Sequence, residues 1–470
     1  MRLKRHCLLS IATFVCALLM CGLLEVQADE GDQEIVNLVI EELASGDAER
    51  QAGAIALARD IPGSALTQAL AAELPKLSPP LQVQLLSTLG DRGDATVLPA
   101  VVAAGGHADE SVRVAALKAV GQLGDASNVL LLARRAAETK GAEQAAARAS
   151  LYRLRGPETD ATVMNEIASA SANAKVELIR AVGERNIAQG AQTLLAAAED
   201  ENRRVRIESL RMLRVVAEPK DIPSLLRFLL SLTNRAEQTE AEITVAGVVH
   251  KIEDPNRQAQ TVLSAALATV KDATNQPSVL RVLGRIGDNG GLPTLRAALR
   301  SQDADVRDAA IRALADWPTP EPSDDLLKIA QTADSQVHRI LALRGFVRLL
   351  ARRGDLPAPQ AVELYQQAMD LAPNAVEKKR VLSGLSGATS LAALEMAAGY
   401  VSDPALRLEA ESAVVQIAGR LGEGHPQQAL GRLEGIVKTT ANDTIRDQAQ
   451  EAIDRMKGLG STQPSEDAAQ

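Results

Sequence analysis

Cysteine and aromatic residues are scarce in this chain of 470 residues. Its three cysteines are Cys7, Cys16 and Cys21, and aromatic side chains make up 1% of the residues. A chain that lost its first 28 residues would therefore contain no disulfide framework, no thiol nucleophile and no CxxCH haem attachment. The shortage of aromatics also argues against a large aromatic-lined pocket for a small molecule.

The apolar content is high in spite of this shortage. Hydrophobic residues make up 46% of the chain and are mostly Ala, Leu, Val and Ile, which suit helices that pack closely together. No segment shows a sustained alternation of apolar and polar residues, so we expect no strands. The composition predicts an all-α protein.

The net charge is −9. An acidic chain repels phosphate backbones, so we expect no nucleic-acid partner. One predicted helix is locally basic, with five arginines between residues 203 and 214. Without interleaved aromatics, this basic stretch is interpreted as a solvated helix face.

Residues 1–28 are typical of a signal peptide. Arg2, Lys4 and Arg5 precede an almost unbroken apolar run from Leu8 to Leu24, and a small-residue cleavage site ends at Ala28, before Asp29. We therefore predict cleavage between Ala28 and Asp29 and export to the periplasm or beyond.

Two alternatives for this segment remain open. The apolar run is at the lower limit of membrane-spanning length, so it could be a retained anchor. Lipid attachment at Cys21 is the second alternative, although Met20 stands where a small residue is usual. Contact with a membrane is expected only if the segment is uncleaved or lipidated.

A short phrase recurs six times along the chain: an Asp or Asn, two residues, an aliphatic residue, and then a basic residue. We predict that the Asp or Asn caps a helix and that the aliphatic residue enters the apolar stripe between layers. The first and last residues of the six copies are Asp109 and Arg113, Asn202 and Arg206, Asp303 and Arg307, Asp334 and His338, Asp403 and Arg407, and Asn442 and Arg446.

Each phrase begins a predicted helix, and a second amphipathic stretch follows it. The helix from Glu110 is expected to end at Gly124-Asp125, and similar stops are expected at Gly90-Asp91 and Gly287-Asp288. Each unit is therefore predicted to contain two helices.

The spacing of the aliphatic residues is close to 30 residues, the length of two helices with short turns. The pattern predicts a right-handed α-solenoid of about 12 helical pairs. Residues 29–317 are expected to form a repeat array that continues through a variant set at 318–457, after the proline-rich loop from Pro318 to Pro322. The polar residues 458–470 are expected to be a disordered tail.

The phrase resembles the HEAT repeat family, in particular the short bacterial HEAT-like repeats of secreted proteins. The similarity is carried by Asp109-Glu-Ser-Val112-Arg113 with Leu123-Gly124-Asp125, and by Asp303-Ala-Asp-Val306-Arg307. Gln82 and Glu177 depart from it, because they stand where Arg is usual. These departures put an unbroken ladder of Asp–Arg pairs in doubt, but not the solenoid.

The sequence contains no convincing catalytic or metal-binding motif. After residue 28 the histidines are His107, His250, His338 and His425, each far from the next. A solenoid brings together residues about one repeat apart, so these four are not expected to converge. We predict no enzyme activity, no metal and no cofactor.

The sequence therefore predicts a non-catalytic exported scaffold for protein–protein interaction, through a concave surface formed by the second helix of each pair. The identity of the protein partner is not specified. Two alternatives are a bilin-lyase-like HEAT enzyme, because similar repeats occur in chromophore lyases, and an accessory subunit of a secreted polysaccharide-processing or cytochrome system. The second rests on a weaker resemblance of the segment from Trp317 to Leu406 to modules of secreted multidomain proteins.

Overall fold

A computed structural model describes residues 28–460 except 273, 275, 422 and 423. The predicted signal peptide lies outside the described residues, apart from Ala28, and so do residues 461–470. Within the described part of the chain, helices are the only regular secondary structure. This confirms the all-α prediction.

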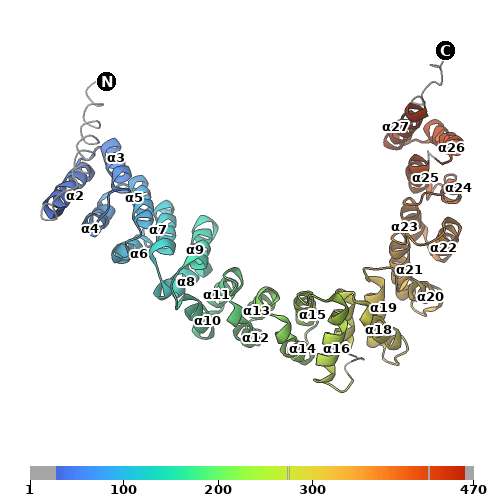
Figure 1. Cartoon of the computed structure of the whole chain (residues 1–470), viewed down its shortest axis with the longest axis horizontal. Helices are drawn as coiled ribbons and strands as arrows, with labels where there is room; N and C mark the ends of the chain where they lie inside the picture. The colour runs from blue at the N-terminus through green and yellow to red at the C-terminus, as the bar shows by residue number, and fades with distance from the viewer. Residues whose placement is uncertain (1–27, 273, 275, 422–423, 461–470) are drawn as a thin grey trace, which may run out of the picture. The chain divides into compact units, whose positions relative to one another are not determined.

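The helices alternate between two layers (Figure 1). The odd-numbered helices, called the first layer here, are α3 (Ala48–Ala58), α5 (Pro79–Arg92), α7 (Glu110–Leu123), α9 (Gly141–Arg153), α11 (Ala172–Glu184), α13 (Arg203–Val216), α15 (Arg235–Val249), α17 (Pro277–Ile286), α19 (Ala304–Ala315), α21 (Gln336–Leu350), α23 (Ala375–Leu385), α25 (Arg407–Leu421) and α27 (Asp443–Gly460).

The even-numbered helices form the second layer, and several of them have only seven or eight residues. They are α2 (Ala28–Ala44), α4 (Ser64–Glu73), α6 (Leu98–Ala104), α8 (Val129–Glu138), α10 (Thr159–Ser169), α12 (Ala191–Ala197), α14 (Ile222–Ser231), α16 (Gln258–Leu267), α18 (Leu292–Ala298), α20 (Ser323–Thr332), α22 (Ala358–Leu371), α24 (Leu391–Ala398) and α26 (Pro426–Thr439).

Pairing each first-layer helix with the second-layer helix that follows it gives twelve pairs, from α3–α4 to α25–α26, with α2 and α27 at the two ends. The predicted solenoid of about 12 pairs is therefore present. The chain divides into two compact units between Val216 and Ala217. The predicted transition at 317–318 lies inside the second unit, where α19 and α20 pack on each other.

Helix α7 shows why these segments are helical. Asp109 caps it and accepts a hydrogen bond from the backbone N–H of Ser111. Val112, Ala116 and Leu123 follow a helical period and are buried, which places them on one apolar stripe between the layers. The helix ends at Gly124, as the sequence predicted.

Two helix ends differ from the sequence prediction. Helix α5 does not stop at Gly90-Asp91 but continues to Arg92, because Gly93 takes the left-handed conformation (φ 71°) that closes the helix. Helix α27 extends to Gly460, so the backbone of residues 458–460 is helical where the sequence predicted the start of the tail. Glycine lowers helix stability only modestly, so a helix can fray through it rather than stop.

Glycines also set the spacing of the first layer. A Cβ atom on Gly345 of α21 would lie 2.8 Å from the Cα of Ala315, which closes α19. A Cβ atom on Gly284 of α17 would lie 2.7 Å from the Cα of Ala313. At these crossings one helix backbone rests directly on the next, and a side chain has no room.

Trp317 is packed rather than presented to a partner, as the sequence favoured. Its side chain is fully buried after the end of α19. Its indole Nε1–H donates to Asn289 Oδ1 at 3.4 Å. The side chain thereby fills the joint that precedes the proline-rich loop.

Candidate protein-interaction surface

Four copies of the recurrent phrase have the same geometry. The Asp or Asn accepts a backbone N–H from the first turn of its helix: Asp109 from Ser111 (2.7 Å), Asn202 from Arg204 (2.9 Å), Asp303 from Asp305 (2.8 Å) and Asn442 from Ile445 (3.0 Å). These groups would otherwise be unsatisfied at the helix start.

The arginine of these four copies turns back to the carbonyl oxygens of the preceding turn. The contacts are Arg113 to His107 and Ala108, Arg206 to Asp200 and Glu201, Arg307 to Ser301, and Arg446 to Thr440. Gln82 makes an equivalent bond, since its amide donates to Leu77 at 3.0 Å. An amide therefore does the same work where Arg is missing.

The other two copies depart from this geometry. Asp334 precedes the actual cap, Ser335, and His338 Nε2 lies 3.0 Å from Asp308 Oδ1 of the neighbouring helix. Asp403 accepts from Ala405 in a turn ahead of α25, and Arg407 donates to Glu411 and to the carbonyl of Thr439. Helix α25 starts four residues after Asp403, so this aspartate cannot cap it.

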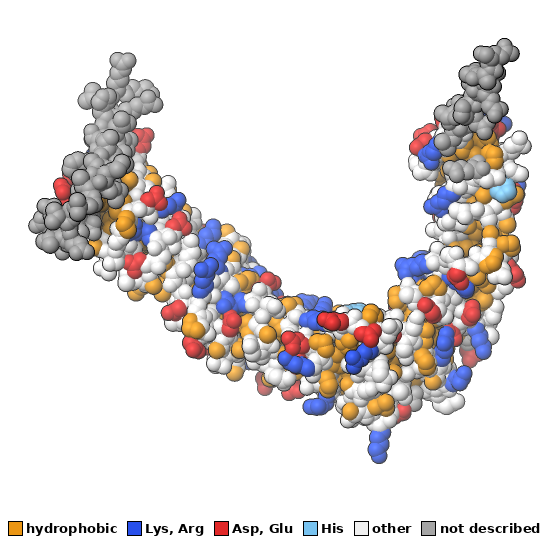
Figure 2. Space-filling model, in the orientation of Figure 1, with side chains coloured by type: hydrophobic (Ala, Val, Ile, Leu, Met, Phe, Trp, Pro, Cys, Tyr) orange, Lys and Arg blue, Asp and Glu red, His pale blue; other side chains and the backbone are white. Residues whose placement is uncertain are grey.

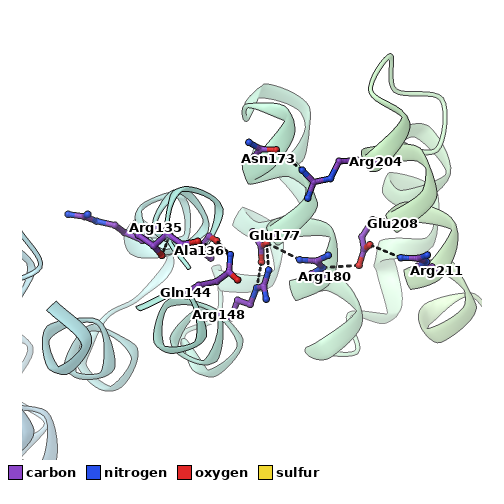
Figure 3. A network of polar contacts seen from close by, with 11 residues as sticks. Arg135, Ala136, Gln144, Arg148, Asn173, Glu177, Arg180, Arg204, Glu208 and Arg211 are labelled. Carbon is purple, nitrogen blue, oxygen red and sulfur yellow. Dashed lines mark hydrogen bonds and ion pairs between the residues drawn. The ribbon is translucent and has the colours of Figure 1, made fainter. Parts of the chain in front are cut away.

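Arginines and glutamates form a continuous row across α9, α11 and α13 (Figure 3). Arg148 donates to both carboxylate oxygens of Glu177 at 2.7 Å, which raises the pKa of this arginine. Arg180 then links Glu177 to Glu208, with both distances 2.9 Å. Arg211 lies 3.5 Å from Glu208 at the far end.

The row presents its positive groups to solvent. The side chains of Glu177 and Glu208 are 5% and 10% exposed, whereas those of Arg180 and Arg211 are 27% and 52% exposed. Tyr152 is half-buried beside the row, and burial, with Glu177 nearby, raises the pKa of its phenol to about 12. Tyrosine and arginine are the side chains that most often anchor protein interfaces.

The second unit contains similar clusters. Glu242 of α15 is fully buried and accepts from Arg281 at 2.6 Å and Arg235 at 3.0 Å, while Arg285 lies 3.7 Å away. Farther along, Glu377 of α23 accepts from Arg344 through both oxygens. In Figure 2, Lys and Arg side chains gather over α9 and over α21.

Sequence reasoning overlooked these carboxylates. It treated Glu177 only as a departure from the repeat pattern, and it did not consider the residues that bind it, which come from neighbouring repeats. The available signal was an acidic residue inside an apolar helical stripe, next to the aliphatic anchor Val176. A charge at a position predicted to be buried requires a partner.

A second recurrent contact was also overlooked. A basic residue at the end of a first-layer helix donates to carbonyl oxygens at the end of the preceding first-layer helix. These contacts are Arg92 to Ala58 and Gly63, Arg185 to Tyr152 and Leu154, Arg348 to Ala315 and Trp317, and Arg420 to Ser386. Cations are favourable at helix carboxyl ends, where carbonyls lack intrahelical partners.

Replacing Arg185 by Met is therefore expected to destabilise the first unit by about 2 kcal/mol, since several charge-assisted hydrogen bonds are lost and the carbonyls of α9 stay buried. Arg185 is 12% exposed and also pairs with Asp160 at 2.6 Å. Urea unfolding followed by circular dichroism measures the change. The control is Arg134→Met on α8, where the side chain is exposed, and equal stability of the two variants would contradict the assignment.

Within residues 28–460 and outside the four omitted positions, no three His, Cys, Asp or Glu side chains are grouped so that they could hold a metal ion. In the same part of the chain, no helix has both the length and the apolarity needed to cross a membrane. His107, His250, His338 and His425 lie on separate elements.

A family model of HEAT repeats matches residues 259–346, which confirms the resemblance for this stretch. No curated protein matches the sequence of the chain. Among solved structures, that of Kap121p is similar with a TM-score of 0.50 and 11% identity, over 92% of this chain and 55% of Kap121p. Kap95p, from a structure that describes its binding to RanGDP, has a TM-score of 0.49 and 12% identity, over 93% and 70% of the two chains.

The chain thus spans about half of the length of Kap121p. At this level of identity, the similarity shows the fold alone. The protein is a HEAT-repeat solenoid.

Proposed function

We propose that the mature protein is an exported, non-catalytic scaffold that binds a protein partner through the first layer of its helices. The observation that supports this most directly is the row of partly exposed guanidinium groups held by buried carboxylates. Each arginine is already oriented by its carboxylate, so little side-chain entropy is lost when a partner binds. A solenoid that presents such groups on successive helices suits an extended contact.

This surface differs from the one expected from the sequence. We had expected the second helix of each pair to form it, whereas the arginine rows run along the first helices. The second-layer helices are shorter, and fewer contacts link them to one another across repeats. The lyase and accessory-subunit alternatives gain no support from the described residues.

Charge reversal on the row tests the proposal. Arg204 and Arg211 are exposed, and Arg180 still holds Glu208 when Arg211 is changed. Affinity capture from the native envelope fraction is expected to recover a protein partner with the wild type and to lose it with the double variant Arg204→Glu, Arg211→Glu. Exposed charges at an interface govern partner choice and association rate.

The matched control is Arg134→Glu, because this exposed arginine lies on α8 of the second layer. It is expected to keep the partner. Equal capture by the double variant, with its circular dichroism unchanged, would place the interface elsewhere.

The export part of the proposal is supported by residues 1–28 alone. Mass spectrometry of the envelope protein is expected to show a chain that begins at Asp29. An intact Met1 would exclude cleavage, and a lipid on Cys21 would make the protein membrane-attached.

A further inference from the structure

Three exposed aliphatic side chains occupy the same position in three successive first-layer helices. Val337, Val376 and Leu408 are the second residues of α21, α23 and α25, and they are 57%, 59% and 48% exposed. Only five large hydrophobic side chains are this exposed among the described residues. Exposed aliphatics are ordinary singly, but a row of them at one repeat position points to a contact surface.

The packing of these helices brings the three residues to one edge. Successive first-layer helices run in the same direction, and α21 packs on α23, which packs on α25. Gly384 faces Val347 across the first contact, so Val376 lies level with Arg339, close to Val337. The ion pair of Lys379 with Glu409 (2.9 Å) likewise places Leu408 level with Lys378.

Positive charge surrounds these side chains. The first nine residues of the three helices contain six Lys or Arg and three Glu. Two of these glutamates, Glu377 and Glu411, are buried, whereas Arg344 and Arg380 are 43% and 56% exposed. Asp334 and Asp403 in the preceding turns leave the count positive. The exposed charge is therefore mainly cationic on an otherwise acidic chain.

We propose that this α21–α25 edge, defined by Val337, Val376, Leu408 and the cations Arg339, Arg344, Lys378 and Arg380, binds an extended acidic segment of the partner protein. Neighbouring helices lie about 10 Å apart, and an extended chain rises about 3.3 Å per residue. One aliphatic side chain at about every third residue would therefore meet the three aliphatics in turn, and acidic residues between them would meet the cations. This inference rests on the proposed scaffold function and names the chemistry of the partner.

Other occupants fit the edge less well. Nucleic acid would match the positive charge but gains little from aliphatic side chains, because bases bind best by stacking on aromatics. A second copy placed symmetrically on the same edge would bring like charges together. An acidic, aliphatic peptide satisfies both features of the edge.

A defined peptide tests the inference. The probe is fluorescein-labelled Leu-Glu-Asp-Leu-Glu-Asp-Leu, and its fluorescence anisotropy is measured with the full-length protein. We expect saturable binding that weakens as salt is raised, because exposed charges are screened. The same peptide with Lys in place of Glu and Asp, and a single-stranded oligothymidylate, are expected not to bind.

The triple variant Val337→Ser, Val376→Ser, Leu408→Ser is expected to weaken binding by on the order of tenfold or more, since contact with several aliphatic side chains is lost. The three residues are exposed, so the variant is expected to fold. The control is Leu267→Ser on α16, where the side chain is 50% exposed, and it should bind as the wild type does.

Absence of binding, equal binding by the triple variant, or equal binding of the Lys peptide or the oligothymidylate would overturn the inference. The proposed scaffold function would still stand if capture of the native partner depended on Arg204 and Arg211. If that dependence failed while the peptide bound as expected, the edge would remain a binding site and only the arginine row would lose its role.

Discussion

Replacing Gly345 by alanine is expected to destabilise the second unit by about 2 kcal/mol. The new methyl group would lie 2.8 Å from both the Cα and the carbonyl oxygen of Ala315. These are backbone atoms at the end of α19, so α21 and α19 must move apart to make room. Urea unfolding of the full chain and hydrogen exchange of α19 and α21 measure the effect.

Gly435→Ala provides the matched control. Gly435 is also inside a helix, α26, but a Cβ atom there has no neighbour within 4 Å. Alanine is favoured over glycine inside a helix, so this variant is expected to be unchanged or to gain up to about 1 kcal/mol. If both variants were equally stable, the close approach of α21 to α19 would not set the spacing of the layer.

Replacing Glu242 by glutamine is expected to cost about 3 kcal/mol, because Arg281 and Arg235 lose their common carboxylate at a fully buried site. The pKa of Arg281 is already lowered by burial, against the opposing effect of Glu242. Without the carboxylate, the buried guanidinium group has no counter-charge. Calorimetry of the full chain and hydrogen exchange of α15 and α17 check this prediction.

Glu395→Gln serves as the comparison. Glu395 pairs with Arg432, and both side chains are 46% exposed. Solvent-exposed pairs of this kind contribute less than about 1 kcal/mol. A loss for Glu242→Gln no larger than that for Glu395→Gln would mean that the cluster around Glu242 is not structural.

Much of the fold could be predicted because local rules govern it. The caps Asp109 and Asp303, the buried stripe that includes Val112, and the stop at Gly124 all depend on residues within one helix or its turn. Even the helix count followed from the repeat length. The stop at Gly90 was wrong because glycine is tolerated inside a helix, and only the backbone shows that Gly93 adopts the left-handed conformation.

The candidate surface could be predicted much less well. Glu177 and Arg148 are separated by 29 residues, and Arg344 and Glu377 by 33. Both separations are close to the repeat length, but the offset of one helix against the next decides which side chains meet. A composition or period contains no information about that offset.

The sequence by itself determined that this protein is an all-α array of helical pairs, because helix periodicity and capping act within about one turn. Only the tertiary structure decided which layer presents the arginines and which glycines allow two helices to touch. It also decided that Val337, Val376 and Leu408 form one row. These features arise from packing between repeats, where side chains about 30 residues apart compete for the same space and the same counter-charge.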